Sequence, residues 1–96
     1  MLNTHHLVTF KTLVKTGNFT QTAQQLGLTQ PAVSQHIKKL EQGLGATLVI
    51  RHGRTTELTH AGEVLFKHIL NLEVCYERFM EKWQQEVVQE RDQQAV

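Results

Sequence analysis

Glycines that directly follow short amphipathic runs constrain the first 45 residues of this chain more than any other feature. The apolar residues between Thr4 and Thr16 recur at helical spacing, and Gly17 follows them. A second run, capped by Asn18, ends in the same way at Gly27. Glycine adopts the left-handed backbone conformation that ends a helix. We therefore expect two short helices joined by minimal turns.

A third helix is predicted to begin after the N-cap Thr29 and to run to about Leu44, with the only proline, Pro31, in its first turn. One side of this helix is an apolar stripe that faces a core. The opposite side carries hydrogen-bonding and cationic groups near the helix start. These residues are Gln30, Ser34, Gln35, Lys38 and Lys39.

The pattern changes after Gly45. Residues 47–50 favour a strand, the sequence HGR at residues 52–54 favours a turn, and residues 55–58 favour a returning strand. We expect a hairpin that carries Arg51 and Arg54 near its tip.

Thr59 is expected to cap a long helix that ends near residue 90. About 30 helical residues would extend about 45 Å, which is further than the core of so short a chain can reach. Its apolar residues form a near-heptad seam suited to a second helix: Leu65, Ile69, Leu72, Tyr76, Phe79, Trp83 and Val87. The seam can pack on its own domain or on a second chain. We favour the second chain, because the preceding helices supply apolar faces of their own.

Charge is distributed unevenly along the chain. Up to His60 there are six Lys and Arg but only two Glu, whereas the remainder has four Lys and Arg and seven Asp and Glu. A basic N-terminal part is suited to a polyanion, which the acidic C-terminal part would repel.

Several classes of protein are not expected. The one cysteine, Cys75, excludes an internal disulfide and a thiolate zinc cage, and favours a cytoplasmic location. Neither a signal peptide nor a run of about 20 apolar residues is recognisable. The six His form no HExxH or HxxxH pattern, and no catalytic constellation or phosphate loop is present. We expect no metal, no cofactor, no membrane and no enzymatic activity.

The arrangement of helix, tight turn, helix and basic hairpin indicates a helix-turn-helix whose second helix enters the major groove of DNA. Gln30 can bond an adenine edge through both atoms of its amide, and Gln35 offers a second amide. Ser34 can contact a phosphate or a base, and Lys38 a guanine or a phosphate. The hairpin arginines can neutralise phosphates or enter a narrow minor groove.

Residues 18–62 resemble the N-terminal winged helix-turn-helix of LysR-type transcriptional regulators. The most specific pieces are TQPAVSQHIKKLE, the LG that follows, LVIR and LTHAG, in the right order and spacing. The resemblance covers about two thirds of the chain. It implies a mainly α fold with three helices and a two-stranded β-hairpin wing, followed by a long linker and dimerisation helix. We assign residues 1–58 to the DNA-binding domain, 59–90 to the linker helix and 91–96 to a polar tail.

The resemblance also implies roles for individual residues. Thr20 opens the supporting helix near a phosphate, and Thr29 precedes the recognition helix. That helix starts with Gln30, Pro31, Ser34 and Gln35, and the wing cations are Arg51 and Arg54. Gln35 occupies a position that is often Arg in the family, so an adenine-favouring amide replaces a guanine-favouring fork.

We predict that the chain binds double-stranded DNA sequence-specifically as a homodimer, in the cytoplasm and on the nucleoid when bound. Paired linker helices would place recognition helices in successive major grooves, so the target is an interrupted inverted repeat. A small-molecule effector is expected to act only through a C-terminal domain that this sequence lacks. Two alternatives remain open: a winged-helix module that docks a protein, and a short antagonist that pairs with a full-length regulator.

Overall fold

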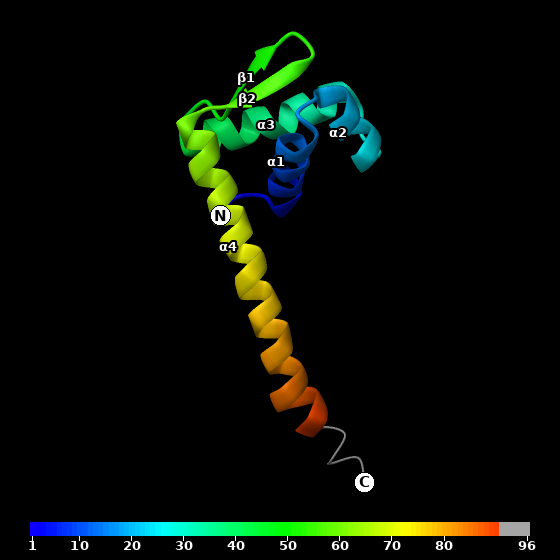
Figure 1. Ribbon diagram of the computed structural model, residues 1–96, viewed down its shortest axis with the longest axis vertical. Helices are drawn as coiled ribbons and strands as arrows, with labels where there is room; N and C mark the ends of the chain where they lie inside the picture. Colours follow the sequence, from blue (N-terminus) through cyan, green and yellow to red (C-terminus); the bar gives the residue numbers. More distant parts are fainter. Residues whose placement is uncertain (91–96) are drawn as a thin grey trace.

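The computed structural model describes residues 1–90 as a small helical head from which one long helix extends (Figure 1). The head begins with α1 (Thr4–Thr16), α2 (Phe19–Leu26) and α3 (Gln30–Leu44). These bounds confirm the three predicted helices. Gly17 and Gly27 end the first two helices with φ of 69° and 65°, in the left-handed region.

Side-chain caps start the helices of the head. The carboxamide oxygen of Asn18 accepts from the backbone N–H of Gln21 at 3.0 Å, and the Thr29 hydroxyl accepts from Ala32 at 3.2 Å. Each cap satisfies a backbone donor that has no partner inside the helix. The local sequence therefore fixes where the short helices start.

The core lies where α1 packs against α2, α3 and the long helix. Phe10 and Leu13 of α1 are fully buried, as is Val33 of α3. The hydroxyl of Thr22 is also fully buried, but it donates to the carbonyl of Asn18 at 2.9 Å and therefore carries no unmet desolvation cost. Burial of each large apolar side chain contributes roughly 1.5–3 kcal/mol.

The hairpin consists of β1 (Val49–His52) and β2 (Thr55–Leu58), which pair antiparallel. The second strand matches its prediction, but the first both starts and ends two residues later than predicted. The backbone N–H of Leu48 donates to the Glu41 carboxylate at 2.7 Å, and its carbonyl accepts from Thr59 at 3.0 Å. Thr59 lies opposite Leu48 in the register, so this carbonyl bond continues the pairing, but the Leu48 N–H is taken by Glu41 and the pair stays incomplete.

The long helix α4 (His60–Trp83) continues through a π-helical turn, η1 (Gln84–Val88), to residue 90. As predicted, the hydroxyl of Thr59 caps it by accepting from Gly62 at 3.0 Å. The predicted polar tail, residues 91–96, lies outside the described residues. Within residues 1–90, no helix is both long enough and apolar enough to span a membrane.

The structure divides the predicted seam of α4 into two parts. Leu65 and Ile69 are only 6% and 5% exposed, because they pack inside the core of the head. An ion pair between Lys11 of α1 and Glu73 joins the helices just below this point. The rest of the seam lies beyond the head. Its residues Leu72, Tyr76, Phe79 and Trp83 are exposed, and Val87 is half-buried.

Candidate nucleic-acid interface

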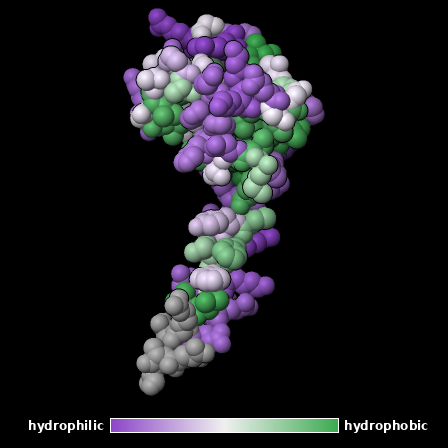
Figure 2. Space-filling model, turned by 180° about the vertical axis from the view of Figure 1, so that it is seen from behind, coloured by the Kyte–Doolittle hydropathy of each residue, from purple (hydrophilic) through white to green (hydrophobic). Residues whose placement is uncertain are grey.

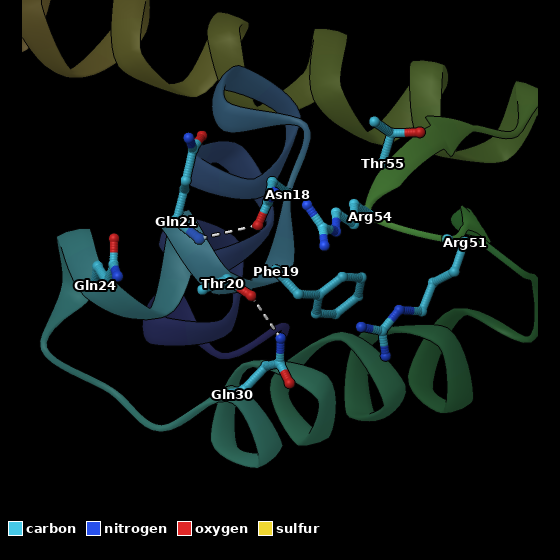
Figure 3. Close-up of a pocket in the computed structure, with 10 residues that line it drawn as sticks. Asn18, Phe19, Thr20, Gln21, Gln24, Gln30, Arg51, Arg54 and Thr55 are labelled. Carbon is cyan, nitrogen blue, oxygen red and sulfur yellow. Dashed lines mark hydrogen bonds between the residues drawn. The ribbon is translucent and has the colours of Figure 1, made fainter.

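A hollow of about 460 Å³ lies between α2, the start of α3 and the tip of the hairpin (Figure 3). The two wing arginines, Arg51 and Arg54, line one side of it, and Thr20 and Gln30 line the other. The fold therefore brings together four residues that the sequence placed on three separate elements.

The exposed face of α3 borders this hollow. Gln30, Pro31, Gln35 and Lys38 are exposed there, and Ser34 is half-buried. The apolar stripe on the other side of α3 is buried, so this polar face is the one that remains available to a ligand. Amide, hydroxyl and ammonium groups at helical spacing match the edges of bases and the phosphates of a duplex.

The two helices of the motif are linked by a hydrogen bond between exposed side chains. The amide nitrogen of Gln30 donates to the hydroxyl oxygen of Thr20 at 2.8 Å (Figure 3). The bond ties the first residue of α3 to the second residue of α2 and sets the direction of the Gln30 amide.

An aromatic ring supports the first wing cation. The guanidinium carbon of Arg51 lies 4.1 Å from the centre of the Phe19 ring. A cation above the face of an aromatic ring is attracted by its negative π-density. The contact directs Arg51 away from the hairpin and towards α2 and α3.

A smaller hollow of about 200 Å³ extends the interface along α3. Ser34, Lys38 and Glu41 line it from the helix, and Arg51 lines it from the hairpin. Arg51 therefore borders both hollows. The Glu41 carboxylate is occupied by the Leu48 N–H, which leaves the Lys38 ammonium and the Arg51 guanidinium as the charged donors here.

The cations of the interface have no carboxylate partner among residues 1–90. In this part of the chain Lys11 pairs with Glu73, and a ring nitrogen of His52 lies 2.7 Å from a carboxylate oxygen of Glu57. Positive charge that is exposed and unpaired favours a polyanionic ligand. No group of three His, Cys, Asp or Glu side chains in this part of the chain is arranged to hold a metal ion.

Three predicted site residues lie outside both hollows. Thr29 caps α3 through its hydroxyl, and Pro31 and Gln35 lie on the exposed surface of that helix. Conversely, the larger hollow includes residues that the sequence reasoning missed or placed elsewhere: Asn18, Phe19, Gln21, Gln24 and Thr55. The polar spacing of Gln21 and Gln24 on α2 was a usable signal, whereas the role of Phe19 depends on tertiary packing.

Residues 4–63 match the family described as "Bacterial regulatory helix-turn-helix protein, lysR family". The HTH-type transcriptional activator CmpR of a Synechocystis strain is 36% identical over 77 residues, which cover 80% of this chain and 25% of CmpR. The matched parts of the chain span a quarter or less of the length of curated relatives such as CmpR.

Solved structures with a similar fold include the full-length LTTR LysG from Corynebacterium glutamicum. Its TM-score is 0.80 at 26% identity, over 91% of this chain and 30% of LysG. The crystal structure of the BenM_DBD/benA site 1 DNA complex has a TM-score of 0.75 at 27% identity, over 84% of this chain and 94% of that one. Both likenesses extend beyond the head into the long helix, since the head alone is shorter than the matched part.

Proposed function

Because the chain belongs to the lysR family of bacterial regulatory helix-turn-helix proteins, we propose that it binds duplex DNA sequence-specifically and that it does so as a dimer. The observation that carries the proposal is the hollow in which Thr20, Gln30, Arg51 and Arg54 converge beside the exposed face of α3. A similar fold was solved in the BenM_DBD/benA site 1 DNA complex. The family relatives are named as transcriptional regulators, and we assign this chain no catalytic role.

In this proposal α3 enters the major groove, which is about 12 Å wide and admits a helix. Gln30 and Gln35 read adenine edges through their amides, and Ser34 contacts a base or a phosphate. Lys38, Arg51 and Arg54 neutralise phosphates, which sets the affinity and makes it fall with salt. Pro31 rigidifies the first turn at the DNA surface, and Thr29 holds that turn in place through its cap.

We propose that two chains pair through the part of the seam that lies beyond the head. Leu72, Tyr76, Phe79 and Trp83 are between 44% and 63% exposed, an unusual density of large apolar side chains for an exposed helix. The rings of Phe79 and Trp83 lie 5.8 Å apart and form one aromatic patch. Figure 2 shows green, apolar side chains interspersed with white and purple ones along α4 below the head.

Val87 extends this surface by another turn of helix. Leu65 and Ile69 support it from inside the head, because their burial fixes the direction in which α4 leaves. Two heads held by paired α4 helices would present two α3 helices to one side of the duplex. We therefore propose an interrupted inverted repeat as the target.

We place the chain in the cytoplasm, where a duplex target is accessible. The matched parts cover only 20–25% of the relatives' length, and we propose that any small-molecule effector acts through regions outside this sequence.

Selection from a pool of random duplexes tests the proposal. The retained DNA is sequenced for the chain, for Gln30→Ala and for a control, Gln25→Ala, whose side chain is exposed on α2 but does not line the hollow. We expect a two-fold-symmetric motif for the chain and for the control, and a motif relaxed at one position per half-site for Gln30→Ala. A retained pool without any enriched motif would contradict sequence-specific binding.

A further inference from the structure

Thr20 and Gln30 form an exposed hydrogen bond that the head does not need for folding. The two side chains are exposed, and each helix has its own cap, Asn18 for α2 and Thr29 for α3. The bond is the Gln30 amide N–H donated to the Thr20 hydroxyl at 2.8 Å. A bond between exposed groups adds little stability, because water can replace either partner. Its clear consequence is the orientation of the Gln30 amide.

The amide keeps all the atoms that an adenine contact requires. A glutamine amide has two N–H donors and one oxygen acceptor. Adenine presents the N7 acceptor and the N6 donor in the major groove, so a bidentate contact uses one N–H and the oxygen. Thr20 takes the other N–H. The bond to Thr20 therefore fixes the plane of the amide and leaves the second hydrogen of the same nitrogen, together with the oxygen, for the base.

The hydroxyl of Thr20 also keeps a donor of its own. In the bond to Gln30 its oxygen accepts, so its hydrogen is free for a second partner. Thr20 lines the same hollow as Arg51 and Arg54, where phosphates of a bound duplex would approach. A phosphate oxygen that accepts from Thr20 would complete a chain of hydrogen bonds from the DNA backbone to the base-reading amide. Each bond in such a chain polarises the next and strengthens it.

We propose that Thr20 is a positioning residue for base reading: its hydroxyl orients the Gln30 amide for adenine and couples that orientation to a phosphate contact. This inference rests on the proposed function, since it requires α3 to lie in the major groove. A glutamine held in its reading position before binding loses less rotamer freedom when it contacts the base. The ligand class is duplex DNA with an adenine at the position that Gln30 reads.

The test measures discrimination at one base pair. Selection with Gln30→Ala identifies the A·T pair that this variant no longer prefers. The selected duplex is compared with a second duplex in which this A·T pair is replaced by G·C. Dissociation constants for both duplexes are measured by fluorescence anisotropy, and their ratio is the discrimination. A phosphate contact affects both duplexes alike and cancels in this ratio. The readout therefore separates the orientation of Gln30 from affinity for the backbone.

Four variants complete the experiment. Thr20→Val removes the hydroxyl and keeps the shape, Thr20→Ser retains the hydroxyl, and Thr20→Val is repeated in the Gln30→Ala background. Thr12→Val is the matched control, because its hydroxyl bonds a carbonyl within α1 and lies outside the interface. Circular dichroism establishes that each variant is folded.

We expect Thr20→Val to lower the discrimination roughly 2- to 10-fold, the effect of one hydrogen bond. Thr20→Ser and Thr12→Val keep the discrimination of the unaltered chain, and Thr20→Val has no further effect on the ratio once Gln30 is alanine. An unchanged ratio in Thr20→Val, or an equal loss in the Gln30→Ala background, would overturn the inference while leaving sequence-specific binding intact. A chain that binds both duplexes equally, with no preference at any position, would overturn the proposed function and this inference with it.

Discussion

Gly62, in the first turn of α4, lies against Leu48 and Leu58 at the base of the hairpin. A Cβ atom built on it would lie 2.2 Å from the carbonyl oxygen of Leu48 and 3.0 Å from a methyl carbon of Leu58. The Leu48 carbonyl cannot turn away freely, because it accepts from the backbone N–H of Thr59 at 3.0 Å. Gly62→Ala must therefore push the first turn of α4 away from the Leu48 backbone. The side chain is small, but the group that it meets is backbone.

The magnitude follows from three terms. Overpacking that shifts backbone costs about 1–3 kcal/mol, and weakening the bond from Thr59 to Leu48 adds about 0.5–1.5 kcal/mol. Alanine is favoured over glycine in a helix by at most about 1 kcal/mol, which offsets part of this loss. We expect Gly62→Ala to lower the free energy of unfolding by about 1–3 kcal/mol.

Gly43 provides a matched control in α3. A Cβ atom on it would meet only a methyl carbon of Leu2 at 3.7 Å, an ordinary contact. Gly43→Ala should therefore keep the helix-propensity gain and raise the free energy of unfolding by about 0.5–1 kcal/mol. The same chemical change is predicted to have opposite signs at two helical glycines.

The assay is urea unfolding followed by circular dichroism. All variants are measured at one chain concentration, because dimerisation links the apparent stability to concentration. Stability is compared through the midpoint and the slope of each transition. If Gly62→Ala proved as stable as the unaltered chain, or if both variants changed in the same direction, the close approach of α4 to Leu48 would be refuted.

Three further predictions concern the interface, the seam and the dependence on pH. Arg51→Ala should weaken binding to all sequences evenly and reduce the log–log salt slope by about 1 per head; a loss confined to one base position in an anisotropy titration would contradict its phosphate role. Trp83→Ala should raise the dimer dissociation constant roughly 10- to 100-fold in analytical ultracentrifugation, whereas unchanged association would remove Trp83 from the dimer interface. Partial burial and the neighbouring His36, Lys39 and His5 lower the pKa of His6, so its protonation is easier in the unfolded chain and stability should fall as the pH drops through about 6.5. Urea midpoints measured across this pH range test the assignment. His6→Gln should make the loss of stability with falling pH less steep, and an equally steep loss would count against the assignment to His6.

The helix ends of the head could be predicted from sequence because the signals that set them are local. Asn18 and Gly27 act on backbone groups of their own helix, within four residues. The start of β1 could not be predicted in this way. The N–H of Leu48, which would complete the pair with Thr59 opposite it, is taken by the Glu41 carboxylate of α3. Strand propensity is a local property, so it gives no information about a partner that only the tertiary fold brings into contact.

The same distinction applies to the interface and to the seam. The polar face of α3 is visible in the sequence, since helical spacing separates it from the apolar stripe. The placement of Arg51 over Phe19 depends on how the hairpin folds back over α2, which spacing does not reveal. Likewise, the heptad pattern of α4 is continuous, although the head buries Leu65 and Ile69 and leaves the later positions exposed. Periodicity identifies an apolar face but not the partner that covers it.

The central claim is that this chain recognises a specific duplex, and one titration tests it most directly. Binding to the selected duplex and to a scrambled duplex of the same composition is measured by anisotropy from about 50 to about 200 mM salt. We predict at least a roughly 100-fold preference for the selected duplex and, for about 8 phosphate contacts per dimer, a log–log slope near −7. Equal affinity for the two duplexes, or an affinity that does not change with salt, would contradict the account.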